Sequence, residues 1–85
     1  MMDPKLLLEA LEIEKNGDWD RSHRIVQQNL TPDANWVHAY LHRREGVMWN
    51  ARYWYDRVNK PVPDYDLDTE WQELYDHVQK QLDSL

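Results

Sequence analysis

Two histidines and a glutamate recur at helical spacing in the middle of the sequence. His38, His42 and Glu45 stand at positions i, i+4 and i+7, so a helix would present them on one face. Two imidazoles one turn apart can chelate a divalent metal ion, and a carboxylate on the next turn can join them. His23, from the preceding helix, could add a third imidazole. The spacing therefore indicates a candidate metal site formed by His38, His42 and Glu45.

The same histidines fit two other interpretations. The motif differs from the His-Glu-x-x-His motif of zinc proteases, because Ala39 stands where that motif has its glutamate. Partly buried imidazoles could form a structural hydrogen-bond network with Asn50 and tyrosine hydroxyls. They could also bind an organic ligand or an anion, and in a small-molecule or metal-dependent enzyme Glu45, Asn50 and Tyr53 would assist them. No cofactor is expected, because the sequence has neither a phosphate-binding loop nor a dinucleotide fingerprint.

Arginines alternate with aromatic residues in the following stretch, which contains Arg43, Arg44, Trp49, Arg52, Tyr53, Trp54, Tyr55 and Arg57. Such mixtures can bind phosphate or stack on bases. The whole chain carries a formal net charge of −6, however, which argues against nucleic-acid binding. Salt bridges and cation–π contacts are the more ordinary use of these arginines.

Composition limits the remaining possibilities. Eighty-five residues make one domain, and the absence of cysteine excludes disulfides and is compatible with the cytoplasm. The apolar run Leu6–Leu8 is too short for a signal peptide or a membrane span, so no membrane association is expected. Residues 43–60 carry five basic and two acidic side chains, whereas residues 61–85 carry one and seven. We expect the acidic last helix to dock near the basic segment.

Start and stop signals divide the chain into five helices and predict an all-α fold. Asp3-Pro4 and Thr31-Pro32 are typical helix starts, and Gly17 and Gly46 are typical helix ends. We expect a first hairpin over 3–30, with its second helix running over 18–30, and a second hairpin over 31–63, with its second helix running over about 48–59. A capping helix over 64–85 has a single apolar stripe, formed by Leu67, Trp71, Leu74, Val78, Leu82 and Leu85.

The two predicted hairpins align with each other when the chain is shifted by 29 residues. Ala10, Gly17, Ser22 and Val26 then fall on Ala39, Gly46, Ala51 and Tyr55. The second hairpin resembles a tetratricopeptide-type repeat, with Ala39, Gly46, Ala51, Tyr55 and Pro63 at that family's offsets. The resemblance implies a concave side that holds an extended peptide near Trp36, Tyr40, Arg43 and Arg44, where the arginines suit a carboxylate. We therefore expect an exposed aromatic patch beside these arginines.

A second resemblance covers roughly residues 17–63. It is carried by the stretches Gly17-Asp18-Trp19-Asp20, Trp36-Val37-His38-Ala39-Tyr40-Leu41-His42-Arg43-Arg44-Glu45-Gly46 and Asn50-Ala51-Arg52-Tyr53-Trp54-Tyr55. These resemble a family of small, mostly bacterial proteins that carries no assigned activity. Its pattern usually has Asp after Glu-Gly, where this chain has Val47, and Ala-Gly where it has Val58-Asn59. Val47 removes a natural N-cap, at a cost of roughly 1 kcal/mol.

These features favour a non-enzymatic protein- or peptide-interaction module, which could be a homo-oligomer. The ligand-binding residues expected for it are Trp36, Tyr40, Arg43, Arg44, His38, His42, Asn50 and Tyr53. The alternatives are a small-molecule or metal-dependent enzyme that uses His38 and His42, and a structural subunit of a larger complex.

Overall fold

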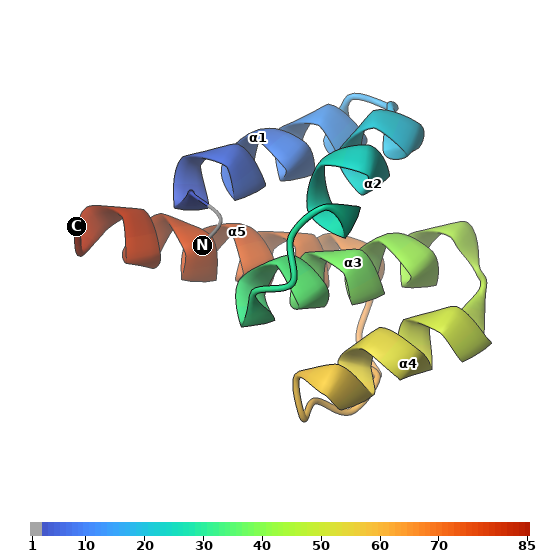
Figure 1. The fold of residues 1–85 in the computed structure, drawn as a ribbon. Coiled ribbons are helices and arrows are strands. Elements are labelled where there is room, and N and C mark those ends of the chain that lie inside the picture. The colour runs from blue at the N-terminus through green and yellow to red at the C-terminus, as the bar shows by residue number, and fades with distance from the viewer. Residues whose placement is uncertain (1–2) are drawn as a thin grey trace.

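The computed structural model describes residues 3–85, which form five α-helices and no strand (Figure 1). The all-α prediction is confirmed. In chain order the helices are α1 (Pro4–Lys15), α2 (Trp19–Gln27), α3 (Pro32–Glu45), α4 (Met48–Arg57) and α5 (Leu67–Asp83).

Local capping explains where four of the helices begin. The side chains of Asp3, Asp18, Thr31 and Asp66 accept hydrogen bonds from backbone N–H groups in the first turns of α1, α2, α3 and α5. Gly17 and Gly46 follow α1 and α3 with φ angles of 100° and 85°, which glycine adopts at no steric cost.

The second helix of each hairpin is shorter than the sequence suggests. Helix α2 ends at Gln27, so the prediction that it reaches Leu30 is wrong, and Leu30 is 65% exposed. The physical reason is the start of α3, because its cap residue Thr31 requires an extended backbone. Helix α4 ends at Arg57, two residues before the predicted end at Asn59, whose φ of 56° is left-handed.

The two hairpins bury equivalent positions. Helix α1 packs on α2, and α3 packs on α4. The aligned pairs Ala10 and Ala39, Ser22 and Ala51, and Val26 and Tyr55 are all buried. The small residues of the first two pairs let the helices of each hairpin approach closely.

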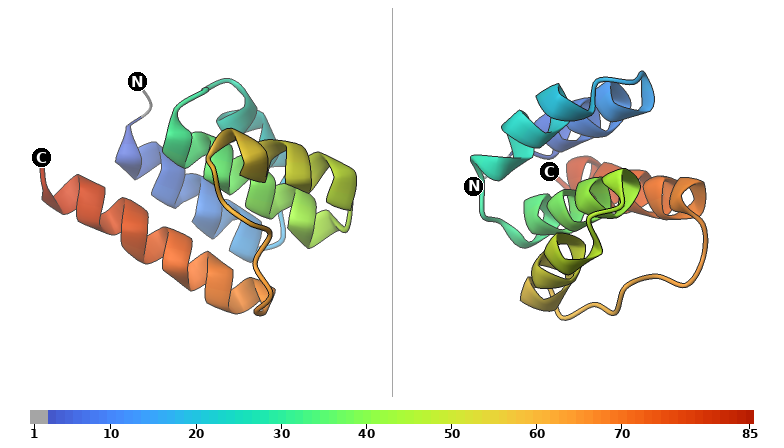
Figure 2. Two further views of the ribbon diagram at one scale, coloured as in Figure 1. Left: turned by 90° about the horizontal axis from the view of Figure 1, so that it is seen from below. Right: turned by 90° about the vertical axis from the view of Figure 1, so that its right-hand side faces the viewer.

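Helix α3 lies at the centre of the domain. It contacts each of the other four helices, and Figure 2 shows it between them. Every residue from Ala34 to His42 is buried, including both histidines. A helix buried on all sides can present different functional groups to different neighbours.

Helix α5 lies across α1 and α3 (Figure 2), and a hydrogen bond from the Tyr55 hydroxyl to Glu70 links α4 to it. The Trp71 indole donates a 3.0 Å hydrogen bond to the carbonyl of Leu11 in α1. The expected charge complementarity is confirmed, because Arg43 and Arg44 of α3 pair with Glu70 and Asp68 of α5.

The start of α4 offers a simple stability test. Val47 occupies its N-cap position and supplies no side-chain hydrogen bond. We expect Val47→Asp to stabilise the protein by about 1 kcal/mol, because the carboxylate can accept an orphan N–H and favours the helix dipole. For a domain of this size the melting temperature would rise by about 4–8 °C. Val47→Ala is the matched control, and equal stability of the two variants would contradict the capping explanation.

Candidate metal centre

Three imidazoles converge where the two hairpins meet. His23 comes from α2, and His38 and His42 come from successive turns of α3. One nitrogen from each ring can be chosen so that all three lie within 4.8 Å of one another. The closest pair, Nε2 of His23 and Nε2 of His38, is 3.1 Å apart. This arrangement is a candidate three-histidine metal centre.

The packing of α2 against α3 brings the histidines together. His38 and His42 share a face of α3 because they are four residues apart. His23 follows Ser22, whose buried position lies between α1 and α2 and matches Ala51 of the second hairpin. The distance between His23 and the α3 histidines therefore depends on how the first hairpin docks on the second.

Two indole rings flank the cluster. The Trp19 ring stacks on His23 with a centroid distance of 4.8 Å and an interplanar angle of 11°. The Trp54 ring stacks on His38 at 4.0 Å and 15°. Trp19 is itself fixed, because its Nε1–H donates a 2.7 Å hydrogen bond to the carbonyl of Leu41. These rings limit the orientations of both imidazoles and surround the nitrogens with apolar surface.

Burial keeps two of the histidines in their neutral form. Burial, together with the neighbouring His23 and His42, lowers the pKa of His38 to about 3. Burial and His42 also lower the pKa of His23. Neutral imidazole is the form that binds metal ions, so near pH 7 these two rings need lose no proton to do so.

Glu45 contacts His42 but does not belong to the group of three imidazoles formed by His23, His38 and His42. Its carboxylate lies 2.7 Å from Nδ1 of His42, and its side chain is 34% exposed. The sequence prediction placed Glu45 among the direct ligands, whereas the structure groups His23 with the other two histidines. A carboxylate on Nδ1 leaves Nε2 of His42 free and fixes the ring, as in carboxylate–histidine–metal triads.

The hydrogen bonds of the imidazoles differ from the structural network considered from sequence, which joined them to Asn50 and to tyrosine hydroxyls. Within residues 3–85, His38 and His42 make no hydrogen bond to Asn50 or to a tyrosine, and the Tyr53 hydroxyl accepts from Arg57 instead. Nδ1 of His38 is buried without a hydrogen-bond partner among the described residues. Buried polar atoms are usually paired, so this cluster differs from an ordinary structural network.

The predicted peptide-binding residues lie on another face of α3, beneath α5. Trp36 is 6% exposed and Tyr40 is fully buried. The expectation of an exposed aromatic patch beside the arginines is therefore wrong. The physical reason is the docking of α5 across α1 and α3, where its acidic first turn pairs with both arginines.

Glu70 of α5 occupies the centre of that face. Its side chain is fully buried and accepts hydrogen bonds from Trp36 at 3.2 Å, Tyr55 at 2.6 Å and Arg43 at 2.9 Å. Burial and the hydrogen bond to Glu70 raise the pKa of the Tyr55 hydroxyl. The sequence alone does not single out Glu70, since nothing in its local pattern indicates that it is buried.

Neither the sequence nor the fold connects this protein to another of known activity. The chain matches no family model, no curated protein and no solved structure. None of the helices in residues 3–85 combines the length and apolar character needed to cross a membrane. The functional assignment therefore rests on the geometry of the histidine cluster.

Proposed function

We propose that this protein binds a divalent transition-metal ion through His23, His38 and His42. One observation carries the proposal: a nitrogen from each of the three imidazoles lies within 4.8 Å of the others. Small adjustments of three side chains around an ion would give the metal–nitrogen distances of about 2.0–2.1 Å that are found for zinc.

The donor set also indicates which metals fit. Imidazole suits zinc, nickel, copper and iron, whereas manganese prefers carboxylate, carbonyl and water oxygens. Three histidines leave a further coordination position, which in catalytic zinc sites holds water or substrate. Apolar surroundings such as Trp19 and Trp54 control the access of water to a metal site.

The test is a zinc titration of chelator-treated protein in competition with a chromophoric chelator. We expect one equivalent of zinc per chain, similar binding of nickel and much weaker binding of manganese. Replacing a ligand, in His38→Ala or His42→Ala, should abolish this binding. Glu45→Gln should weaken it by about 10- to 100-fold, because it removes only the group that orients His42.

The fourth histidine provides the matched control. His77 of α5 lies against Asp33, with 2.9 Å between Nε2 and the carboxylate, and is not part of the three-histidine group. His77→Ala should therefore keep full zinc binding. Loss of binding in His77→Ala, or unchanged binding in His42→Ala, would contradict the proposed ligand set.

A role as a protein- or peptide-interaction module is our second proposal. We also keep as proposals a tetratricopeptide-type repeat, membership of the small bacterial family, a homo-oligomeric state and a cytoplasmic location. One observation bears on where a partner would dock. Helix α5 covers Trp36 and Tyr40, whereas Trp49 and Tyr53 of α4 are 74% and 51% exposed. The outer surface of α4 thus carries two exposed aromatic side chains that a partner could contact.

A further inference from the structure

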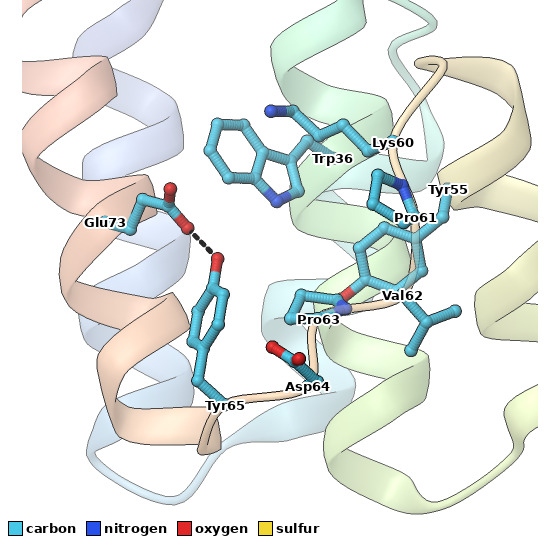
Figure 3. Close-up of a pocket in the computed structure, with 9 residues that line it drawn as sticks. All are labelled: Trp36, Tyr55, Lys60, Pro61, Val62, Pro63, Asp64, Tyr65 and Glu73. Carbon is cyan, nitrogen blue, oxygen red and sulfur yellow. Dashed lines mark hydrogen bonds between the residues drawn. The ribbon is translucent and has the colours of Figure 1, made fainter.

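A cavity that contains none of the three clustered histidines lies beside Trp36. It has a volume of about 280 Å³ and is bordered by α3, α4, α5 and the segment 58–66 that joins α4 to α5 (Figure 3). Three aromatic rings line it, and they come from three different elements: Trp36, Tyr55 and Tyr65. Pro61 and Pro63 form the wall on the side of the joining segment, and their fixed φ angles limit its motion.

Hydrogen bonds tie down the polar ends of the three rings. Trp36 Nε1 and the Tyr55 hydroxyl both donate to the buried Glu70. The Tyr65 hydroxyl donates to Glu73, as Figure 3 shows. With these polar ends engaged, the rings have carbon surface left to offer the cavity, and the faces of aromatic rings carry partial negative charge.

A cation of the protein itself already lies over one of these rings. The Lys60 ammonium is 4.0 Å from the centroid of the Trp36 indole. Among the described residues no carboxylate lies within 4.0 Å of that ammonium, so no ion pair holds it over the indole. Lys60 is otherwise exposed and has a flexible stem, so little holds it in this position.

The charges around the cavity also favour a cation. Asp64 and Glu73 line the cavity itself. A neighbouring hollow shares Trp36, Lys60 and Glu73 with it and adds two carboxylates and one ammonium group, those of Asp33, Asp76 and Lys80. Aromatic faces combined with nearby carboxylates are the usual recognition site for alkylammonium groups.

We propose that this cavity binds an organic ammonium group, best a quaternary or methylated one, against the face of Trp36. Lys60 occupies the position in the absence of the ligand and must swing away when it binds. A methylated ammonium suits the site because it is weakly hydrated and makes van der Waals contact with the rings. The proposal concerns a different face of α3 from the histidine cluster and does not depend on metal binding.

The test follows the five indole N–H signals of ¹⁵N-labelled protein in the presence of EDTA. Tetramethylammonium chloride is titrated against sodium chloride of equal ionic strength. We expect a saturable shift of the Trp36 signal that sodium chloride does not produce. Lys60→Ser should tighten the binding of tetramethylammonium by about threefold or more, because the competing cation is removed.

Lys15→Ser is the matched control for the loss of a lysine. The Lys15 ammonium lies 4.3 Å from the Trp71 centroid, but Trp71 is the only aromatic residue lining that hollow. Lys15→Ser should leave the Trp36 response unchanged and create no new one at Trp71. No saturable shift at Trp36 in the Lys60→Ser variant, or equal shifts at all five indoles, would overturn the proposal.

A peptide titration distinguishes two sources of the ammonium group. A short peptide with one trimethyl-lysine is compared with the same peptide carrying unmodified lysine and with free tetramethylammonium. Tighter binding of the trimethylated peptide than of the free ion supports a side chain of a partner protein. Equal binding of both supports a small free amine, and binding of neither overturns the proposal.

Discussion

Replacing Glu70 with alanine is expected to cost about 3–5 kcal/mol of folding free energy. The substitution removes the acceptor of the Tyr55 hydroxyl and of the Trp36 indole N–H, and it removes the carboxylate partner of the Arg43 guanidinium. Breaking a buried ion pair by removing one partner is costly because the other charge stays buried and uncompensated. A domain of this size has a total stability of about 4–13 kcal/mol, so much of it would be lost.

Urea unfolding followed by far-ultraviolet circular dichroism measures this effect. Glu70→Gln is the second variant, because it keeps the volume and one acceptor oxygen, and we expect a smaller loss of about 2 kcal/mol. Asp76→Asn, on an exposed turn of the same helix, should change the stability by less than about 0.5 kcal/mol. A loss below about 1 kcal/mol for Glu70→Ala would show that Glu70 does not hold α5 against α3.

Metal-free protein is expected to lose stability as the pH falls below about 6.5. The folded protein keeps the pKa of His38 near 3 and lowers that of His23, whereas both titrate near 6.5 in the unfolded chain. The unfolded state therefore binds more protons between these values, and the stability contributed by the neutral rings is present above pH 6.5 and lost below it. Each histidine can contribute a slope of up to about 1.4 kcal/mol per pH unit.

The charged groups near these rings determine how much of that slope appears. Glu45 and Asp20 act against the lowering of the His23 pKa, whereas His42 adds to it. His38→Gln removes the most strongly shifted ring. We expect the loss of stability between pH 7 and 5 to be smaller by about 1–2 kcal/mol in this variant, allowing for partial screening by solvent. Urea titrations of chelator-treated protein at both pH values measure the difference, and parallel pH profiles would refute the assignment.

The sequence predicted the helices well because their signals are local. The caps Asp3, Asp18, Thr31 and Asp66 and the stop at Gly46 act within one turn of their own position. The apolar stripe of α5 likewise predicted an amphipathic helix. It could not show which groove that helix would fill, because an apolar stripe fits either the open side of α4 or the face formed by α1 and α3.

The sequence placed His38, His42 and Glu45 on one helix face and offered His23 only as an additional imidazole. His38 and His42 were recognised together because they lie one turn apart. His23 stands 15 residues before His38 in the sequence, and its proximity depends on the docking angle of two hairpins. The burial of Glu70 and the enclosure of the Trp36 cavity depend in the same way on the position of α5.

The contact between the first and last helices sets the cooperativity of the whole domain. In an open helical array each unit touches only its neighbours, so the ends can fray while the middle stays folded. Here α5 packs on α1, and the hydrogen bond from Trp71 to Leu11 spans 60 residues of chain. If either terminal helix detaches, the buried face of the other terminal helix becomes exposed to solvent. Amide hydrogen exchange in α1 and α5 should therefore proceed through the same global opening as in the central α3.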